Sequence, residues 1–217
     1  MSRALSKTIP ALLPHTANTA ARAGLLTTTR PAPHPRHAYA PTHPPQARHS
    51  SHSPPSAHTP TTPPRKKITL PTLLAMHARA DPITMLTAHD FPSAAVADAA
   101  GMDMLLVGDS LAMVSLGLTS TAEITLDEML LHCRSVARGA GAAFVVGDLP
   151  MGCYEVSPEQ AVQSAIRMVK EGRVQGVKLE GGLEMAGAIA RIVAAGIPVL
   201  AHVGLTPQRQ NALGGFR

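Results

Sequence analysis

The sequence has few of the residues that mark several common classes of protein. It contains no tryptophan, and only 2% of its 217 residues are aromatic, so few side chains are available to stack on nucleic-acid bases. Its two cysteines, Cys133 and Cys153, have no metal-binding spacing and suit a reducing compartment. No apolar run approaches the roughly 20 residues that a membrane-spanning helix needs. We therefore expect neither a nucleic-acid partner nor a membrane span.

Acidic residues are absent from the first 80 positions, which hold ten lysines and arginines. From Asp81 onward, nine basic residues face fourteen acidic ones, a net charge of −5. The overall charge of +5 therefore averages a basic N-terminal segment with an acidic domain. Residues 1–64 also contain thirteen of the twenty prolines. This composition predicts a disordered extension over residues 1–67 and a folded domain over residues 68–217.

The first 25 residues combine arginine, serine, threonine and small apolar residues without any acid. Such a composition is typical of a mitochondrial import peptide. We therefore predict a mitochondrial protein; the alternative is a cytoplasmic protein with an extension that is not imported.

Three apolar segments of the domain each end on a carboxylate. The carboxylates are Asp109 after Leu105–Val107, Asp148 after Ala143–Gly147, and Glu180 after Gly176–Leu179. Continuous apolar runs are typical of buried parallel strands. Because α/β folds place their sites at the carboxyl ends of such strands, we expect the three acids to lie around one site.

The order of expected elements is a helix over residues 68–80, with Thr72 as its cap, and then five strands separated by four helices. This alternation predicts a parallel α/β fold. A flavodoxin-like open sheet and a (β/α)₈ barrel both agree with the pattern, and acids on several strand ends favour the barrel. Because the sequence stops at Arg217, after about five β/α units, we expect a chain shortened at its C-terminus.

The residue types at the strand ends indicate chemistry on an oxygen-rich ligand. Carboxylates without cysteine are the ligands that Mg²⁺ prefers. Lys178 lies two residues before Glu180, so it faces the same side of the strand. His202 ends the fifth strand and Ser110 follows Asp109, and both offer polar contacts to a substrate. A metal that binds a 2-oxo acid acidifies the neighbouring carbon and makes an enolate accessible.

Several motifs, in order, resemble one family, the ketopantoate hydroxymethyltransferases. They are Thr87–Phe91, Val107–Met113, Gly147–Pro150, Val177–Gly182, His202–Gln208 and Leu213–Arg217. The resemblance implies a (β/α)₈ barrel of the phosphoenolpyruvate mutase and isocitrate lyase type. It also implies transfer of a hydroxymethyl group from 5,10-methylenetetrahydrofolate to 3-methyl-2-oxobutanoate, which gives 2-dehydropantoate for pantothenate synthesis.

The resemblance also assigns roles to residues. It implies that Asp109, Asp148 and Glu180 hold Mg²⁺. It implies that the 2-oxo acid contacts Asp109, Ser110, Asp148, Lys178 and His202.

Two features depart from the family pattern. His89 stands where the family often has tyrosine, and the family's general-base glutamate falls beyond Arg217, so no catalytic base is assigned. Two alternatives follow: an inactive fragment that binds substrate or a homologue, and a related 2-methylisocitrate-type lyase, whose Lys-Lys-Cys-Gly type loop is absent from this sequence. Homo-oligomers are expected from the resemblance alone.

Overall fold

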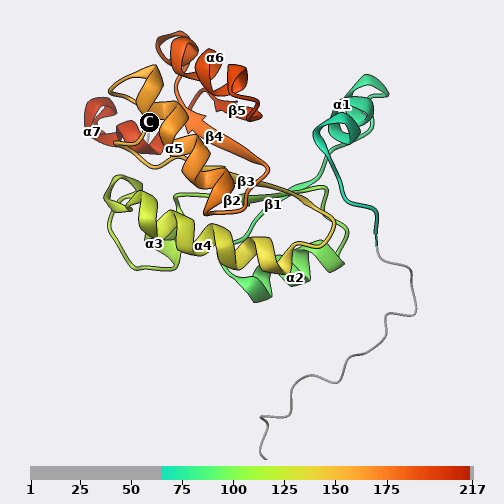
Figure 1. The fold of residues 1–217 in the computed structure, drawn as a ribbon. Coiled ribbons are helices and arrows are strands. Elements are labelled where there is room, and N and C mark those ends of the chain that lie inside the picture. Colours follow the sequence, from blue (N-terminus) through green and yellow to red (C-terminus); the bar gives the residue numbers. More distant parts are fainter. Residues whose placement is uncertain (1–64, 216–217) are drawn as a thin grey trace, which may run out of the picture. The chain divides into compact units, whose positions relative to one another are not determined.

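The computed structural model describes residues 65–215, in which helices and strands alternate (Figure 1). The import peptide and all but the last three residues of the expected disordered extension (residues 1–67) lie in residues 1–64, outside the described residues. The strands are β1 Met85–Thr87, β2 Met104–Val107, β3 Phe144–Asp148, β4 Gly176–Glu180 and β5 Val199–His202. The helices are α1 Leu70–Ala78, α2 Phe91–Ala99, α3 Leu111–Val114, α4 Leu126–Gly139, α5 Pro158–Lys170, α6 Ala186–Ala194 and α7 Gln210–Leu213. Three single turns of 3₁₀-helix complete the order: η1 Thr121–Glu123, η2 Leu183–Met185 and η3 Pro207–Arg209.

The five strands form one parallel sheet in the order β1-β2-β3-β4-β5. A flavodoxin-like sheet would have the order 2-1-3-4-5. Sequential order is instead the arrangement in which each β/α unit adds the next strand of a barrel. The structure therefore selects the barrel-type alternative and confirms the expected α/β fold.

The larger hydrophobic core lies between the sheet and the helices α2, α4, α5 and α6 (Figure 1). Alternate strand residues such as Leu105, Val145 and Leu179 are buried there because side chains in a strand point to opposite faces in turn. Gly147 lies on the same face, where a Cβ atom would come within 3.0 Å of Cys133 Sγ. The helices therefore pack closely against β3.

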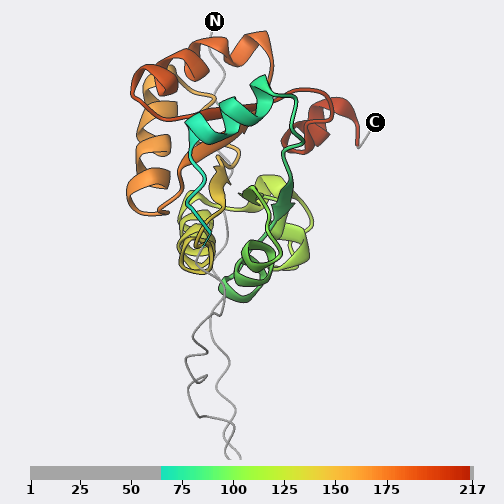
Figure 2. The same ribbon diagram turned by 90° about the vertical axis from the view of Figure 1, so that its right-hand side faces the viewer.

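A smaller cluster covers the opposite face, where α1 lies in front of the strands in Figure 2. Leu73 of α1 packs there against Leu106, Phe144 and Val146. The N-cap of α1 is Thr69, whose hydroxyl accepts from the backbone N–H of Thr72. The expected cap, Thr72, is instead the third helical residue, and its hydroxyl accepts from the backbone N–H of Thr69.

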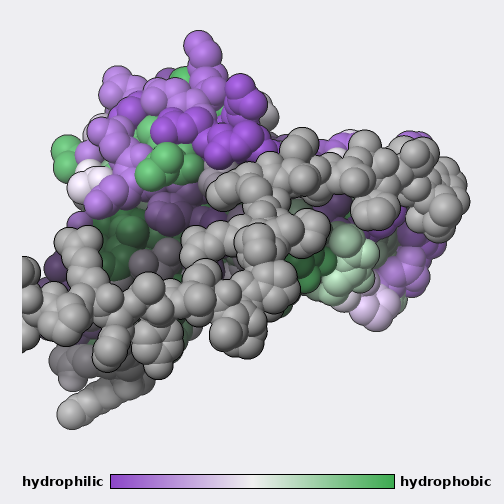
Figure 3. All heavy atoms as spheres, turned by 90° about the horizontal axis from the view of Figure 1, so that it is seen from below, coloured by the Kyte–Doolittle hydropathy of each residue, from purple (hydrophilic) through white to green (hydrophobic). Residues whose placement is uncertain are grey.

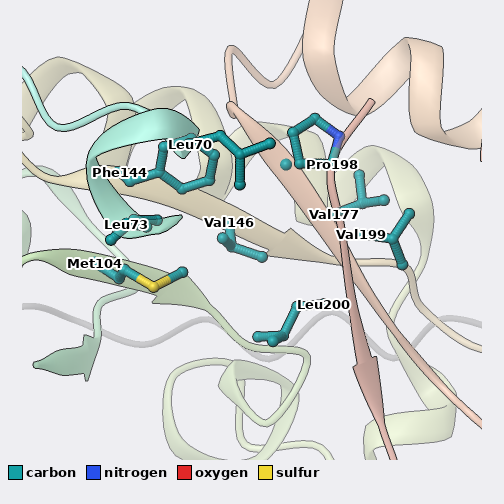
Figure 4. A pocket seen from close by; sticks show the side chains of 10 residues that line it. Leu70, Leu73, Met104, Phe144, Val146, Val177, Pro198, Val199 and Leu200 are labelled. Carbon is teal, nitrogen blue, oxygen red and sulfur yellow. The ribbon is translucent and has the colours of Figure 1, made fainter. Parts of the chain in front are cut away.

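An apolar cavity of about 120 Å³ lies beside α1, at the amino ends of the strands (Figure 4). Its lining includes Leu70, Phe144, Pro198 and Leu200, and the lining contains no ionisable side chain. The cavity is therefore at the end of the sheet opposite to the predicted acids, and it offers no catalytic group.

Hydrophobic and hydrophilic side chains are interspersed on the face seen in Figure 3. Within residues 65–215, no helix combines the length and the apolar character needed to cross a bilayer. At the start of this part, Lys67 donates to the carbonyl oxygen of Ala143 at 2.6 Å. At the expected domain boundary, the chain therefore already contacts the residue that precedes β3. The position of the boundary stays a prediction.

Candidate active site

The carboxyl ends of β2, β3 and β4 bring the predicted polar residues together. Asp148 and Lys178 are partners across β3 and β4, and Glu180 and His202 are partners across β4 and β5. Lys178 Nζ donates to Asp148 Oδ1 at 2.6 Å, and the backbone N–H of Asp109 donates to Asp148 Oδ2 at 3.1 Å. Asp148 is therefore held by a lysine from β4 and by the backbone amide of Asp109 after β2.

Gly108 leaves the space that this arrangement needs. A Cβ atom at Gly108 would lie 3.2 Å from Ser110 Oγ and 3.5 Å from Asp148 Oδ2. The hydroxyl of Ser110 and the carboxylate of Asp148 thus approach the same point. A small cavity of about 30 Å³ adjoins Gly108 and Ser110, and His89 is among its lining residues.

Burial makes two of the three carboxylates, Asp109 and Glu180, hard to ionise. Asp109, Asp148 and Glu180 are each 4% exposed or less. Burial, with repulsion from Asp148, raises the pKa of Asp109 to about 6, although the hydrogen bond from Gln208 opposes this. Burial, with repulsion from Asp109, raises the pKa of Glu180 to about 7. An acid with a raised pKa destabilises the fold as the pH rises through that value, so a bound cation would relieve this cluster.

His202 lies at the edge of the cluster and is only partly buried. Its Nδ1 is 3.8 Å from Glu180 Oε1, which is beyond hydrogen-bond length. Nδ1 is buried and has no hydrogen-bond partner. A buried polar atom without a partner is uncommon in folded proteins, so this nitrogen is available to a bound molecule.

Sequence reasoning assigned no role to Gln208 or Tyr154, which contact the same cluster. The side chain of Gln208 donates to Asp109 Oδ2 at 2.7 Å, and its backbone N–H donates to Glu180 Oε2 at 3.1 Å. The hydroxyl of Tyr154 donates to Gln208 Oε1. Gln208 closes the motif His202–Gln208, which was the one available signal.

The carboxylates suit Mg²⁺ by their chemistry, since hard oxygen ligands are those it prefers. Within residues 65–215, however, no group of three or more histidine, cysteine or acidic side chains is arranged to hold a metal ion. Lys178 and Gln208 occupy oxygens of Asp148 and Asp109 instead. Mg²⁺ commonly binds through one or two carboxylates and several waters. The oxygen-only donors and the mutual repulsion of the acids therefore fit this ion, and the three-ligand assignment stays a prediction.

Residues 67–217 match a family model described as ketopantoate hydroxymethyltransferase. The chain belongs to this family. Within the ketopantoate hydroxymethyltransferases, it is 76% identical over 153 residues to the 3-methyl-2-oxobutanoate hydroxymethyltransferase of Emericella nidulans. It is 56% identical over 153 residues to a rice relative, the 3-methyl-2-oxobutanoate hydroxymethyltransferase 2, mitochondrial, of Oryza sativa subsp. japonica. These matches cover 70% of the chain but only 44% and 38% of the two relatives, so the chain spans less than half of their length.

A solved structure gives the same result for the fold. The crystal structure of a phosphonopyruvate hydrolase in complex with oxalate and Mg²⁺ is similar, with a TM-score of 0.50 and 16% identity. The similarity covers 59% of this chain and 50% of the hydrolase. At this low identity the likeness shows the fold alone, which agrees with the barrel-type sheet order of this family member.

Proposed function

We propose that this chain carries part of an active site that makes 2-dehydropantoate, namely the polar residues at the carboxyl ends of the strands. The reaction transfers a hydroxymethyl group from 5,10-methylenetetrahydrofolate to 3-methyl-2-oxobutanoate. The observation that carries the proposal is the cluster of Asp109, Asp148, Lys178 and Glu180 in a chain 76% identical to a relative named for this reaction. The name of that relative and the chemistry of the cluster thus point to the same substrate.

In this proposal, Asp109, Asp148 and Glu180 hold Mg²⁺, with waters completing its ligands. When bound, the ion would withdraw electrons from the 2-oxo acid and acidify the carbon next to its carbonyl. Burial raises the pKa of Asp109 and of Glu180, and repulsion from neighbouring carboxylates raises each further. This supports the assignment, because a bound cation would favour the ionised form of both acids.

The remaining polar groups would orient the substrate. Lys178 balances the charge of Asp148 and would also pair with the carboxylate of the 2-oxo acid. Ser110 offers a hydroxyl that lies, like Asp148 Oδ2, beside Gly108. His202 offers the unpartnered Nδ1 to a bound oxygen. The three groups therefore offer polar contacts to an anionic substrate near the carboxylates.

Space for a larger co-substrate lies next to the cluster. The segments that follow β4 and β5 line an open cavity of about 340 Å³, which includes Gly181, Gly182, Val203 and Gly204. We assign the folate to this side because its lining residues Gly181 and Val203 directly follow Glu180 and His202 in the chain.

Two measurements on the purified 217-residue chain test the proposal. Calorimetry with 3-methyl-2-oxobutanoate should show binding that depends on Mg²⁺ and is lost in Asp148→Asn. Asp127→Asn is the matched control, because Asp127 is an exposed helix residue that pairs with Arg167. No difference between these variants, or no Mg²⁺ dependence, would contradict the assignment.

Proton NMR in deuterated water then separates an enzyme from a binding fragment. Exchange of the hydrogen next to the carbonyl, followed by 2-dehydropantoate when the folate is added, is expected from a complete active site. Binding without exchange would favour a chain that binds the oxo acid and leaves proton removal to another part of the enzyme.

Location and assembly follow as part of the same proposal. The rice relative is named mitochondrial, and the first residues of this chain have the composition of an import peptide. We therefore place the protein in mitochondria and expect it to form homo-oligomers. Import of the full chain into isolated mitochondria, compared with a chain that lacks residues 1–64, tests the first statement; light scattering tests the second.

A further inference from the structure

One buried side chain after β5, that of Gln208, returns to the carboxylates and contacts two of them. Gln208 lies in η3 and is 4% exposed. Its amide nitrogen donates to Asp109 Oδ2 at 2.7 Å and to the carbonyl oxygen of Leu149 at 3.0 Å. Its backbone N–H donates to Glu180 Oε2 at 3.1 Å. Gln208 therefore joins the acids of β2 and β4, two strands that are not neighbours in the sheet.

Tyr154 determines which way the amide of Gln208 points. The Tyr154 hydroxyl is 2.5 Å from Gln208 Oε1 and accepts from the backbone N–H of Glu180 at 3.3 Å. Because that N–H is a donor, the hydroxyl proton is left for Gln208 Oε1. The nitrogen of the amide then has to face Asp109. Tyr154 is itself 3% exposed, so water does not compete for these contacts.

The number of contacts distinguishes this role from a simple anchor for the segment. An anchor needs one hydrogen bond, such as the one to Leu149. Gln208 instead uses the oxygen and the nitrogen of its side-chain amide as well as its backbone N–H. Besides the bond to Leu149, the amide nitrogen donates to Asp109 and the backbone N–H donates to Glu180. Residues that hydrogen-bond to metal ligands and orient them make contacts of this kind. Losing one such residue typically weakens metal binding about 10–100-fold.

We propose that Gln208, oriented by Tyr154, is a positioning residue that fixes Asp109 and Glu180 relative to each other. That the two carboxylates then serve a divalent cation depends on the function proposed above.

The first experiment measures binding of Mn²⁺ to the full chain by calorimetry. Gln208→Met should weaken binding about 10–100-fold. Gln210→Met is the control, because Gln210 donates to Ser120 Oγ at 2.6 Å and so tethers the same segment without touching an acid. The control should change the affinity less than about twofold. Equal losses in both variants, at similar thermal stability, overturn the proposal.

A second variant tests the part played by Tyr154. Tyr154→Phe should weaken Mn²⁺ binding about tenfold by itself. It should add little in a chain that already carries Gln208→Met, because Tyr154 acts through the Gln208 amide. Losses that simply add would overturn the role of Tyr154, since independent sites are additive.

A third measurement needs no cation and separates this proposal from the function. Urea unfolding of Gln208→Met, Asp109→Asn and the double variant should reveal a coupling of about fivefold in the unfolding constant. Coupling in a chain that binds no Mn²⁺ would uphold the positioning role and refute the magnesium site. Absence of coupling would overturn the positioning role, whatever the cation result.

Discussion

The contact between Lys178 and Asp148 allows a quantitative test of the charge balance at the strand ends. The two charged atoms are 2.6 Å apart, and the side chains are 13% and 3% exposed. At an effective dielectric constant of about 20, they attract each other by roughly 6 kcal/mol. The loss of hydration offsets much of this attraction, but removing one partner of a buried pair still costs about 3–5 kcal/mol. Because Asp148 keeps the hydrogen bond from the N–H of Asp109, we expect Lys178→Met to lose about 3 kcal/mol.

The assay is urea unfolding of the full chain, followed by circular dichroism at neutral pH without divalent ions. The double variant Asp148→Asn with Lys178→Met should recover most of the lost free energy, because a neutral amide needs no cation beside it. Arg167→Met is the control, since Arg167 pairs with Asp127 and Glu171 at the surface and should lose less than about 1 kcal/mol. A loss for Lys178→Met as small as that of the control would refute the buried pair.

Further changes test the packing of the helices. Gly139→Ala should lower the free energy of unfolding by about 1–3 kcal/mol, because the added Cβ would approach a backbone oxygen at the start of α2. Gly187→Ala, whose added Cβ would have its nearest contact at 3.9 Å, should be neutral or stabilising in the same denaturation assay. Ser157→Ala should lose about 0.5–2 kcal/mol, since the serine hydroxyl caps α5. Iodoacetamide followed by mass spectrometry should label Cys153 well before Cys133, because Cys133 is fully buried whereas Cys153 is only partly buried.

The sequence was sufficient to predict which strands end on acids and which residues share a face. Apolar runs before Asp109, Asp148 and Glu180 identified β2, β3 and β4, because only buried parallel strands are apolar on both faces. The two-residue spacing placed Lys178 on the same face as Glu180, and the register then put Lys178 beside Asp148. These inferences depend on local periodicity, which a single sequence records directly.

The contacts of Gln208 could not be predicted in the same way. Gln208 is 99 residues from Asp109 and 54 residues from Tyr154 along the chain. The side chains of Gln208 and Tyr154 carry no charge at neutral pH, so no pattern of charge or hydropathy marks them as partners. The prediction of the cap of α1 was wrong for a different reason. Thr69 and Thr72 hydrogen-bond to each other, and residue type alone does not say which of two threonines begins a helix.

The atoms left over by these contacts indicate where a ligand meets the site. Lys178 occupies Asp148 Oδ1, Gln208 occupies Asp109 Oδ2, and the backbone of Gln208 occupies Glu180 Oε2. Glu180 Oε1 and His202 Nδ1 face each other at 3.8 Å, too far for a hydrogen bond. His202 Nδ1 is buried without a partner, and burial makes an unpartnered polar atom unfavourable, so this nitrogen gains most from a group placed beside it. A ligand should therefore enter along the β4–β5 side of the cluster, where Glu180 and His202 stand side by side.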